Sequence, residues 1–351
     1  MSERPTQVRV AVVVLNWDGL VLTRACLQSL FAQTWPDVEV HVVDNGSAND
    51  EAGALRREFG DRIRLHALPQ NAGFTGGCNH AMRIVLAEGR CEFVALLNND
   101  AEADPRWLEE LLAAAADARV GAVASCMRLH DRPDLLDGAG VWLLGNGDSA
   151  PRGRLQPVAD WRQADDLLSA CGGAVLLRCA MLRAIGLFRA DFFANFEDTD
   201  LMLRAVVAGH RIRYAPKAEV RHRLNATIRR VRDLEFNVRS VRNATWAWLV
   251  NLPWPVLLLN LPGFLASNAG IVLLMPLCGR PGVGWAFLRG RLRALGELPA
   301  ILAERRRLRP LRVVPWWRIW WAQRSFVLEY ARLLLLRLRS RRGAVMAATT
   351  P

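Results

Sequence analysis

The chain has 351 residues, of which 52% are hydrophobic, and this is enough for a full core in one large domain with appendages. Its net charge is +12, and the region from Pro281 to Arg342, with fifteen arginines and three glutamates, carries all of that excess. Because these arginines are mixed with Trp and Leu and lie far from the polar motifs described below, the charge pattern argues against nucleic acid and favours an anionic membrane surface as a partner.

The seven cysteines are scattered along the chain without C-x-x-C or zinc-finger spacing. The first residues, Met1 to Gln7, are polar and lead directly into an apolar run, with no sign of an export signal. These features predict free thiols in a reducing compartment.

Apolar runs alternate with helical patterns through the first 130 residues. Strands are predicted at Val8–Leu15, Val38–Val43, Ile63–Leu68, Glu92–Leu97 and Val120–Met127. Helices are predicted at Leu20–Ala32, Asp50–Phe59, Cys78–Ala87 and Asp104–Asp117. This alternation predicts βαβ units, and therefore an α/β fold with a mostly parallel sheet.

The pattern becomes irregular between Arg128 and Gln163, where Gly, Pro and Asp predict loops and short strands of the kind that often hold a second substrate. Order returns at Leu167–Leu177, and Glu197–Val207 has the pattern of an amphipathic helix. Within that helix, the i,i+4 spacing of Asp200 and Arg204 predicts an ion pair on the surface.

The segment Asn243–Gly279 contains no charged residue and is long enough to cross about 30 Å of hydrocarbon as a helix. Prolines and asparagines interrupt it, so that only Val256–Met275 qualifies as a span. Three interpretations stay open, namely a monotopic or re-entrant insertion, a true span and a buried soluble core.

The arginine-rich stretches that follow, Gly284–Leu308 and Trp316–Leu338, are typical of an interfacial anchor, or alternatively of basic helices packed on their own domain. The sequence is therefore divided into an α/β domain at residues 1–240, a helical membrane-associated region at 241–342 and a disordered tail at 343–351.

Two polar motifs in the first third of the chain follow apolar runs, where a parallel sheet presents its ligands. Asp44 precedes the turn-forming pair Asn45-Gly46, so its carboxylate could accept hydrogen bonds from a base or ribose, although the same residues also make an ordinary turn. The glycines of Asn71–Asn79 allow a close approach of backbone to ligand and lead into a helix N-terminus, which favours anions; the alternative is a flexible connection. This motif is neither a Rossmann G-x-G-x-x-G nor a P-loop.

A third motif, Leu97-Asn98-Asn99-Asp100, delivers two amides and one carboxylate to the end of a strand. A hard divalent cation prefers oxygen ligands and commonly bridges a carboxylate to substrate phosphates, so Asp100 suits this role, unless it only caps a turn.

The fourth motif places Glu197 and Asp198 at the start of a predicted helix, after an aromatic segment. A carboxylate positioned there could remove a proton from a hydroxyl group, or could simply cap its own helix. His222 follows a short strand and could complete a metal or diphosphate site, although lone histidines are usually structural.

Taken in order, these motifs resemble the inverting family 2 glycosyltransferases with a GT-A fold, and most closely their bacterial rhamnosyltransferase-like branch. The resemblance covers roughly Val8 to Arg223. It rests on four strings, Val13–Trp17, Asn71–Asn79, Leu97–Asp100 and Glu197–Leu201. It implies a GT-A (Rossmann-like), mostly parallel mixed sheet flanked by helices, followed by the membrane-associated helical region.

The resemblance also implies roles for individual residues. Asp44 would contact the nucleoside, Asp100 and His222 would bind Mg²⁺ or Mn²⁺, and Asp198 would be the general base. The complete set comprises catalytic Asp198 and Glu197, donor-binding Asn16, Asp44, Asn71, Gly73, Phe74, Gly77, Asn98 and Asn99, and metal-binding Asp100 and His222. One departure is that Asn98 occupies the first position of the family's Asp-x-Asp motif, which weakens the support for metal dependence.

The implied activity is transfer of a sugar by single displacement from a nucleotide-sugar donor, with dTDP-L-rhamnose favoured and UDP-sugars next. The implied acceptor is a lipid-linked or cell-surface glycan precursor, such as a polyprenyl-diphosphate-linked glycan, at the cytoplasmic face of the bacterial plasma membrane. The alternatives are a non-catalytic, membrane-bound sensor of sugar nucleotides or glycans, and a nucleotidyltransferase. The latter normally has a glycine-rich basic loop near its first strand, where this chain has Asn16-Trp17-Asp18-Gly19.

Overall fold

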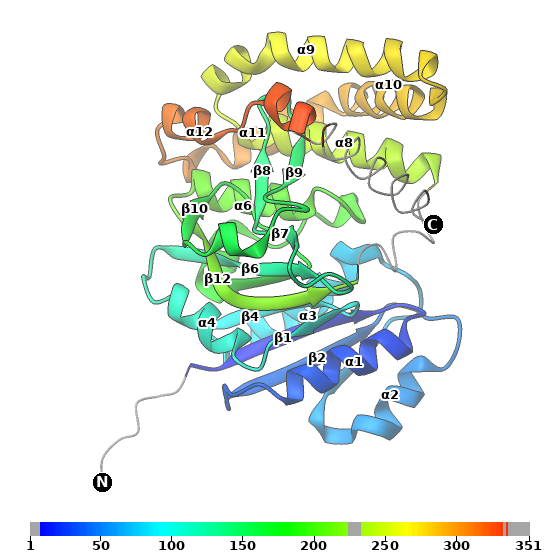
Figure 1. The fold of residues 1–351 in the computed structure, drawn as a ribbon, viewed down its shortest axis with the longest axis vertical. Coiled ribbons are helices and arrows are strands. Elements are labelled where there is room, and N and C mark those ends of the chain that lie inside the picture. Colours follow the sequence, from blue (N-terminus) through cyan, green and yellow to red (C-terminus); the bar gives the residue numbers. More distant parts are fainter. Residues whose placement is uncertain (1–7, 224–232, 333–334, 336–351) are drawn as a thin grey trace, which may run out of the picture.

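The computed structural model describes residues 8–223, 233–332 and 335. One end of the molecule is a large twisted sheet flanked by helices, and the other end is a layer of helices formed by the C-terminal third of the chain (Figure 1). The tail predicted to be disordered, residues 343–351, lies outside the described residues.

The main sheet is mixed, and its strands follow the order β10-β12-β6-β11-β4-β1-β2-β3, with β5 paired to β12 and β7 to β6. Its strands are β1 (Val10–Asn16), β2 (Val38–Asp44), β3 (Arg64–Ala67), β4 (Phe93–Asn98), β5 (Ala101–Ala103), β6 (Val120–Leu129), β7 (Leu136–Gly138), β10 (Asp165–Leu167), β11 (Ala174–Arg178) and β12 (Arg211–His222). Strands β1 to β4 pair in parallel, whereas β11 runs antiparallel to both β4 and β6. The predicted α/β class with a mixed sheet is therefore confirmed.

Helices cover both faces of this sheet, as the nearly continuous apolar run of β1 requires. Val10, Val12 and Val14 pack in one core with α1 (Leu20–Phe31), α2 (Glu51–Phe59) and α4 (Trp107–Ala114). Ala11 and Val13 face the opposite core, which contains side chains of α3 (Gly73–Glu88), α5 (Cys179–Ile185) and α6 (Glu197–Val207).

The helix boundaries differ most from the sequence predictions in α3 and α4. Helix α3 begins at Gly73, five residues before the predicted start at Cys78, so the glycine-rich motif forms the first turns of the helix instead of a loop before it. Gly77 lets this helix pack closely on β1, since a side chain there would collide with Leu15. Helix α4 ends at Ala114, three residues earlier than predicted.

The irregular segment between residues 128 and 163 contains short strands and loops, as predicted. Strand β7 extends the sheet, and β8 (Val141–Leu143) and β9 (Ser149–Pro151) form a hairpin that rises toward the helical layer (Figure 1). At its tip, the Asn146 amide donates to Tyr330 Oη at 3.0 Å and to Ser267 Oγ at 3.3 Å. The hairpin therefore links the sheet to the C-terminal helices.

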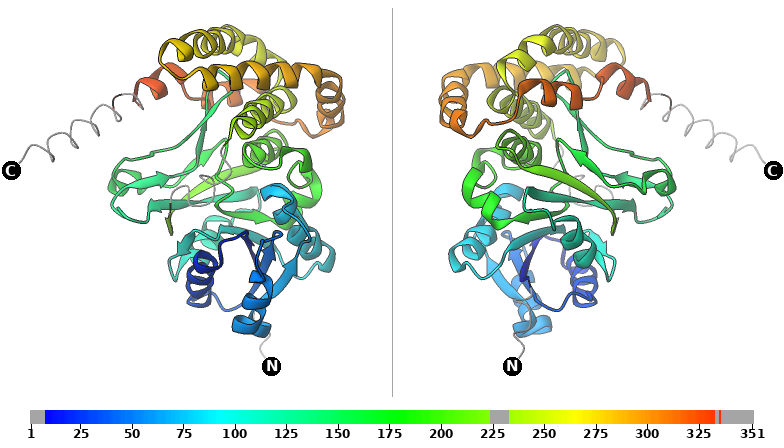
Figure 2. Two further views of the ribbon diagram at one scale, coloured as in Figure 1. Left: turned by 90° about the vertical axis from the view of Figure 1, so that its right-hand side faces the viewer. Right: turned by 90° about the vertical axis from the view of Figure 1, so that its left-hand side faces the viewer.

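The helical layer covers the end of the molecule opposite α1 and α2 (Figure 2). It consists of α8 (Leu234–Asn251), α9 (Trp254–Leu277), α10 (Pro281–Gly296), α11 (Leu298–Arg307) and α12 (Trp316–Ala322). The predicted domain boundary after residue 240 falls inside the continuous helix α8. The small residues Ala286, Gly290 and Ala294 recur every four positions on the buried side of α10, and Gly290 lies directly against Val241 of α8.

The ion pair between Asp200 and Arg204 is present, but the prediction that it lies on the surface is wrong. Both side chains are buried, and Asp200 accepts from Arg204 Nε at 3.0 Å and from Asn251 Nδ2 at 2.8 Å. The spacing of two residues on one helix cannot show what packs over that helix, and here α8 covers α6.

Candidate active site

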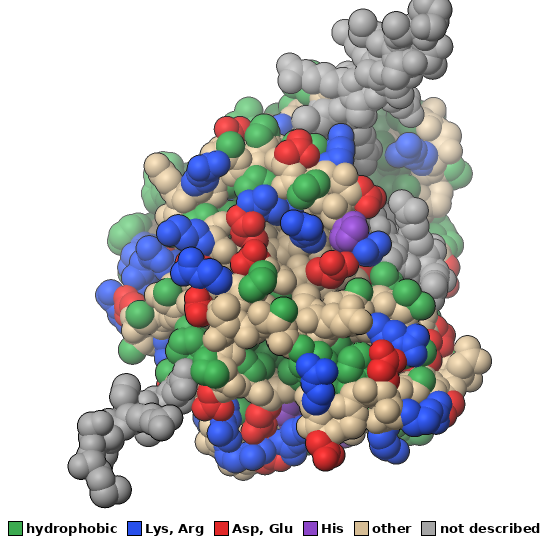
Figure 3. Space-filling model, turned by 60° about the horizontal axis from the view of Figure 1, so that its bottom comes forward, with side chains coloured by type: hydrophobic (Ala, Val, Ile, Leu, Met, Phe, Trp, Pro, Cys, Tyr) green, Lys and Arg blue, Asp and Glu red, His purple; other side chains and the backbone are tan. Residues whose placement is uncertain are grey.

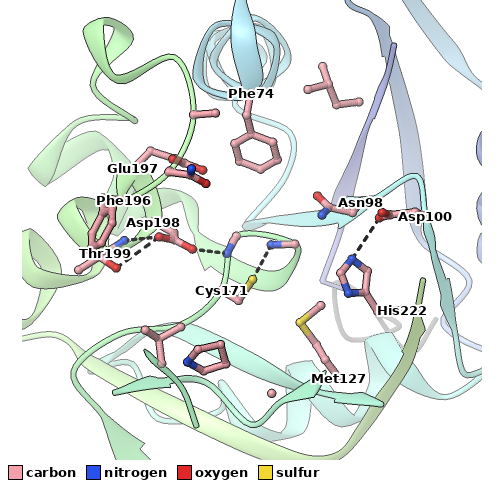
Figure 4. Close-up of a pocket in the computed structure, with 18 of the residues that line it drawn as sticks. Phe74, Asn98, Asp100, Met127, Cys171, Phe196, Glu197, Asp198, Thr199 and His222 are labelled. Atoms are coloured by element: carbon pink, nitrogen blue, oxygen red, sulfur yellow. Dashed lines mark hydrogen bonds and ion pairs between the residues drawn. The ribbon is translucent and has the colours of Figure 1, made fainter. Parts of the chain in front are cut away.

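A pocket of about 420 Å³ lies where the carboxyl ends of β1 and β4 meet the first turns of α3 and α6. Nine of the predicted site residues line it, namely Asn71, Gly73, Phe74, Asn98, Asn99, Asp100, Glu197, Asp198 and His222. Figure 4 shows Glu197 and Asp198 on one side of this space and Asp100 with His222 on the other. Segments that are far apart in the sequence therefore bring two groups of titratable side chains to one cavity.

The three remaining predicted residues do not line the pocket. Asn16 and Asp44 are buried just behind it, where Asn16 Nδ2 donates to Asp44 Oδ1 at 2.8 Å, and Ser47 Oγ donates to the same carboxylate oxygen at 2.5 Å. Gly77 packs against Leu15, as described above. Their neighbours Leu15, Trp17 and Asn45 do line the cavity.

Asp198 and Glu197 have different hydrogen-bonding environments, although they are adjacent in the chain. Asp198 accepts from the backbone N–H groups of Gly172 at 3.0 Å and Thr199 at 2.6 Å. Glu197 is buried, and its Oε2 has no hydrogen-bond partner among the described residues. Donated hydrogen bonds favour the ionised form of a carboxyl group, so the arrangement favours an ionised Asp198 beside a protonated Glu197.

The pKa values follow the same physical causes. Burial raises the pKa of Asp198, and its two backbone donors limit this increase. Burial and the neighbouring charge of Asp198 raise the pKa of Glu197 to about 8. Both pKa values are therefore raised by burial, and of the two carboxyl groups Asp198 is the one with hydrogen-bond donors that oppose this effect.

His222 lies between two carboxylates on the other side of the pocket. Its Nε2 is 3.1 Å from Asp100 Oδ1, and its Nδ1 is 2.7 Å from Asp137 Oδ2. Burial lowers the pKa of His222, but the hydrogen bonds and charges of Asp100 and Asp137 more than reverse this effect and raise it to about 9. Arg154 Nη1 approaches the other oxygen of Asp137 at 3.4 Å.

The segment that leads into α6 is strained. Phe193, Asn195 and Phe196 have φ values of +62°, +70° and +65°, in the left-handed region that side chains other than glycine seldom adopt. Such conformations persist only when the surroundings impose them. Here the buried Asn243 of α8 supplies that restraint, because its Nδ2 lies 2.9 Å from Phe192 O, 3.2 Å from Ala194 O and 3.0 Å from Asn195 O.

The same strained segment contacts the start of α3. Gly73 has a φ of +73°, and a side chain there would collide with the backbone and ring of Phe193. Thr75 N donates to Phe193 O at 3.1 Å. The glycine at position 73 is thus required by the close approach of two pocket walls.

Several residues that line the pocket escaped the sequence analysis. They include Asp137 and Arg154 in the irregular segment, the turn Cys171–Gly173, and Phe236 at the start of α8. The adjacent glycines 172 and 173, inside the ordered stretch predicted at Leu167–Leu177, were a sequence signal for a close backbone approach, whereas Phe236 had no such signal.

Solved structures of other proteins share the overall fold. The fold is similar to that of a mannosyltransferase from Pyrobaculum calidifontis in complex with GDP-Man and Mn²⁺, with a TM-score of 0.50 and 18% identity over 88% of this chain and 86% of that one. It is also similar to GalNAc-T7 with UDP, GalNAc and Mn²⁺, with a TM-score of 0.55 and 12% identity over 70% of this chain and 48% of that one. The fold is therefore GT-A-like, as expected from the sequence.

Sequence comparison gives a match to a known family within this fold. Residues 11–155 match the model described as Glycosyl transferase family 2. An O-antigen biosynthesis protein of Myxococcus xanthus, RfbC, is 30% identical over 236 residues. That match covers 63% of this chain but only 18% of the relative.

Proposed function

We propose that this chain is an inverting glycosyltransferase that moves a sugar from a nucleotide-sugar donor to a hydroxyl group by single displacement. The observation that carries the proposal is the position of Asp100 and Asp198, which come from distant segments and line one pocket. This arrangement combines a group for the donor diphosphate with a base for the acceptor, as the reaction requires.

In the proposed mechanism, Asp198 accepts the proton of the acceptor hydroxyl group. Its hydrogen bonds from Gly172 and Thr199 hold the carboxylate in one orientation and favour its ionised form. The acceptor oxygen then attacks the anomeric carbon from the face opposite the leaving nucleotide, and the bond from that carbon to the diphosphate oxygen breaks. The anomeric configuration is therefore inverted.

The donor set on the other side of the pocket fits a divalent cation. Asp100 and His222 supply one carboxylate and one imidazole, and the amides of Asn98 and Asn99 lie in the same lining. Within the described part of the chain, no group of three His, Cys, Asp or Glu side chains could hold a metal ion, so substrate oxygens and water would complete the ligand shell, as is usual for Mg²⁺. When bound, Mg²⁺ or Mn²⁺ supplies positive charge beside the donor diphosphate.

The donor that we propose is dTDP-L-rhamnose, with UDP-sugars next. Support for this donor comes from the motif resemblance, and the O-antigen biosynthesis relative supports only a role in making a cell-surface glycan. Trp17 and Asn45, which line the cavity next to the buried Asn16 and Asp44, would bind the nucleoside end.

The proposed acceptor is a lipid-linked glycan precursor at the cytoplasmic face of the bacterial plasma membrane. The hairpin β8–β9 supports this assignment, because Ser149, Ala150 and Pro151 line the pocket while its tip contacts α9. Among the described residues, α9 alone is long and apolar enough to cross a membrane by length and composition. The hairpin therefore connects the site with the part of the molecule nearest to a membrane.

Two measurements test the proposal, namely thermal stabilisation by a set of sugar nucleotides and release of the nucleotide from them. Full-length protein with Mg²⁺ is mixed in turn with dTDP-rhamnose, UDP-sugars and GDP-mannose, and its thermal stability is measured. We expect the largest stabilisation with dTDP-rhamnose, and slow release of dTDP in the absence of acceptor. Stabilisation without hydrolysis or transfer under any condition would indicate a non-catalytic sensor and contradict the proposal.

A further inference from the structure

Helix α9 has an inverted distribution of polar and apolar side chains. Its exposed positions all carry apolar residues, namely Trp254, Pro255, Leu258, Leu259, Leu261, Pro262, Leu265, Ala266, Ala269, Leu273, Leu274, Pro276 and Leu277. Its polar side chains, Asn260, Ser267 and Asn268, lie on the covered side. A surface helix of a protein in water shows the opposite pattern, so the exposed side of α9 is suited to a nonpolar solvent.

Each polar residue of the covered side is bonded to a neighbouring element. Asn260 Nδ2 donates to Gln323 Oε1 at 2.8 Å, and Asn268 Oδ1 accepts from Arg291 Nε of α10 at 2.8 Å. Ser267 Oγ accepts from Asn146 at the tip of the β8–β9 hairpin. The helix is thus fixed to three parts of the protein along one stripe.

This attachment conflicts with a membrane-spanning orientation. If α9 crossed the bilayer while docked, then Arg291, the neighbouring Arg289 and Arg293 of α10, and the polar hairpin tip would enter the hydrocarbon with it. If α9 left its partners, Asn260, Ser267 and Asn268 would face lipid without hydrogen-bond partners. Both alternatives are unfavourable, because hydrocarbon offers no partners for polar or charged groups.

The surroundings of the exposed side match the headgroup layer of an anionic membrane. Trp285, Trp316, Trp317 and Trp321 are 52%, 40%, 49% and 74% exposed. The side chains of Arg289 and Arg293 on α10 are 46% and 50% exposed. Indole rings favour the membrane interface and arginine favours lipid phosphate. On the opposite end of the molecule, by contrast, acidic, basic and apolar side chains are interspersed (Figure 3).

We infer that α9 lies in the plane of the cytoplasmic leaflet, with its exposed side in the acyl region and α10 and α12 in the headgroup layer. In Figure 1, α9 runs across the end of the molecule instead of projecting from it. The partner is an anionic lipid bilayer. The inference rests on the proposed function only for the choice of membrane. It deepens that function because the docked protein would keep its pocket at a fixed distance from the lipid surface.

Depth measurements by spin labelling test the inference in full-length protein bound to phosphatidylcholine–phosphatidylglycerol vesicles. Leu258, Leu265 and Leu273 are 65%, 57% and 67% exposed and sample α9 over 15 residues, or about 22 Å of helix. Each is changed to Cys in a Cys278→Ser background, which removes the exposed native cysteine. The other cysteines are buried or half-buried, so the Cys278→Ser protein alone measures background labelling. Accessibility to oxygen and to a water-soluble nickel chelate gives the depth of each label.

We expect equal depths at the three positions and strong protection from the nickel chelate. A label at Val21→Cys, an equally apolar position that is 76% exposed on α1, serves as the matched control and should stay accessible to the chelate with or without vesicles. Depths that spread by about 20 Å along the bilayer normal would show a span. Labels that remain water-exposed, or that are protected without vesicles by a second copy of the chain, would also overturn the inference. None of these readouts depends on sugar transfer, so a failure of the proposed reaction is distinguishable.

Discussion

At the scale of single residues, the adjacent carboxyl groups of Asp198 and Glu197 differ in the hydrogen bonds that they accept. Asp198 has two backbone donors, whereas Glu197 Oε2 has no partner within the described part of the chain. We expect Asp198→Asn to lower kcat by at least about a hundredfold, as loss of a general base does, with donor affinity nearly unchanged. Glu197→Gln imitates the protonated side chain and should keep most of the activity. The opposite ranking in a transfer assay would move the base to Glu197.

The same pair predicts two pH effects. Because only ionised Asp198 accepts the proton and its pKa is raised, kcat/KM should fall as pH drops through a value above the usual aspartate pKa of about 3.9. For Glu197, the folded pKa of about 8 exceeds the unfolded value, so the folded state holds the extra proton and stability falls as pH rises from about 4 to 8. Thermal unfolding between pH 5 and pH 9 should show a smaller decline for Glu197→Gln than for the wild type.

Asp137 should influence metal binding without being a ligand. Its carboxylate accepts from His222 Nδ1, which leaves Nε2 directed at Asp100. Mutation of a hydrogen-bond partner of a metal-binding histidine typically weakens metal binding about 10- to 100-fold. In calorimetry with Mn²⁺ and a nucleotide diphosphate, we expect Asp137→Ala to weaken binding by that factor, Asp137→Asn to weaken it less, and Asp100→Ala to remove metal-dependent binding. Equal binding by Asp137→Ala and the wild type would show that His222 needs no such orientation.

Residues at strand ends were predictable, and residues in irregular segments were not. Asp100 follows β4, and the end of a buried strand in an α/β sheet is a general place for ligands, so a sequence pattern could find it. Asp137 reaches the same pocket because β7 pairs with β6, and no local pattern between residues 128 and 163 encodes that pairing.

At the scale of elements, α8 holds the segment that precedes α6 in its strained conformation. Asn243→Ala would leave the carbonyl groups of Phe192, Ala194 and Asn195 without their shared donor, at a cost of about 1–3 kcal/mol of unfolding free energy. We also expect a lower kcat with little change in donor KM, because the segment orients Asp198 and not the nucleoside end. Asn237→Ala in the first turn of α8, where the half-buried side chain donates only to Asp233 O, is the matched control. A loss of stability with kcat intact would reduce Asn243 to a purely structural role.

The part played by α8 could not be predicted from its composition. The uncharged run from residue 243 indicated a membrane segment, yet its first part is the buried half of α8 and only the second part is the exposed helix α9. Apolar patterns show that a helix avoids water, but they do not distinguish a protein neighbour from lipid. The buried pair of Asp200 and Arg204 has the same explanation, since Asn251 of α8 completes it.

At the scale of the whole molecule, the excess positive charge is concentrated in the C-terminal part of the chain, which forms the helical layer. Residues 281–342 carry the net +12, whereas the rest of the chain is neutral overall. A protein with this distribution should approach an anionic surface with its helical layer first, since each arginine near such a surface contributes about 1 kcal/mol. This orientation places the hairpin β8–β9 between the lipid and the pocket.

Vesicle binding should therefore contain an electrostatic part and an apolar part that respond differently to salt. In sedimentation assays with phosphatidylglycerol vesicles, binding should weaken as ionic strength rises, because the Debye length shrinks from about 10 Å at 0.1 M to about 3 Å at 1 M. A residual fraction of the protein should stay bound to vesicles at high salt, since insertion of the exposed leucines of α9 into lipid does not depend on charge. Leu265→Asp should remove the residual fraction, while Val21→Asp, on the far helix α1, should change neither part. Binding that is abolished by salt alone would show that the arginines hold the protein at the surface and that α9 does not enter the acyl region.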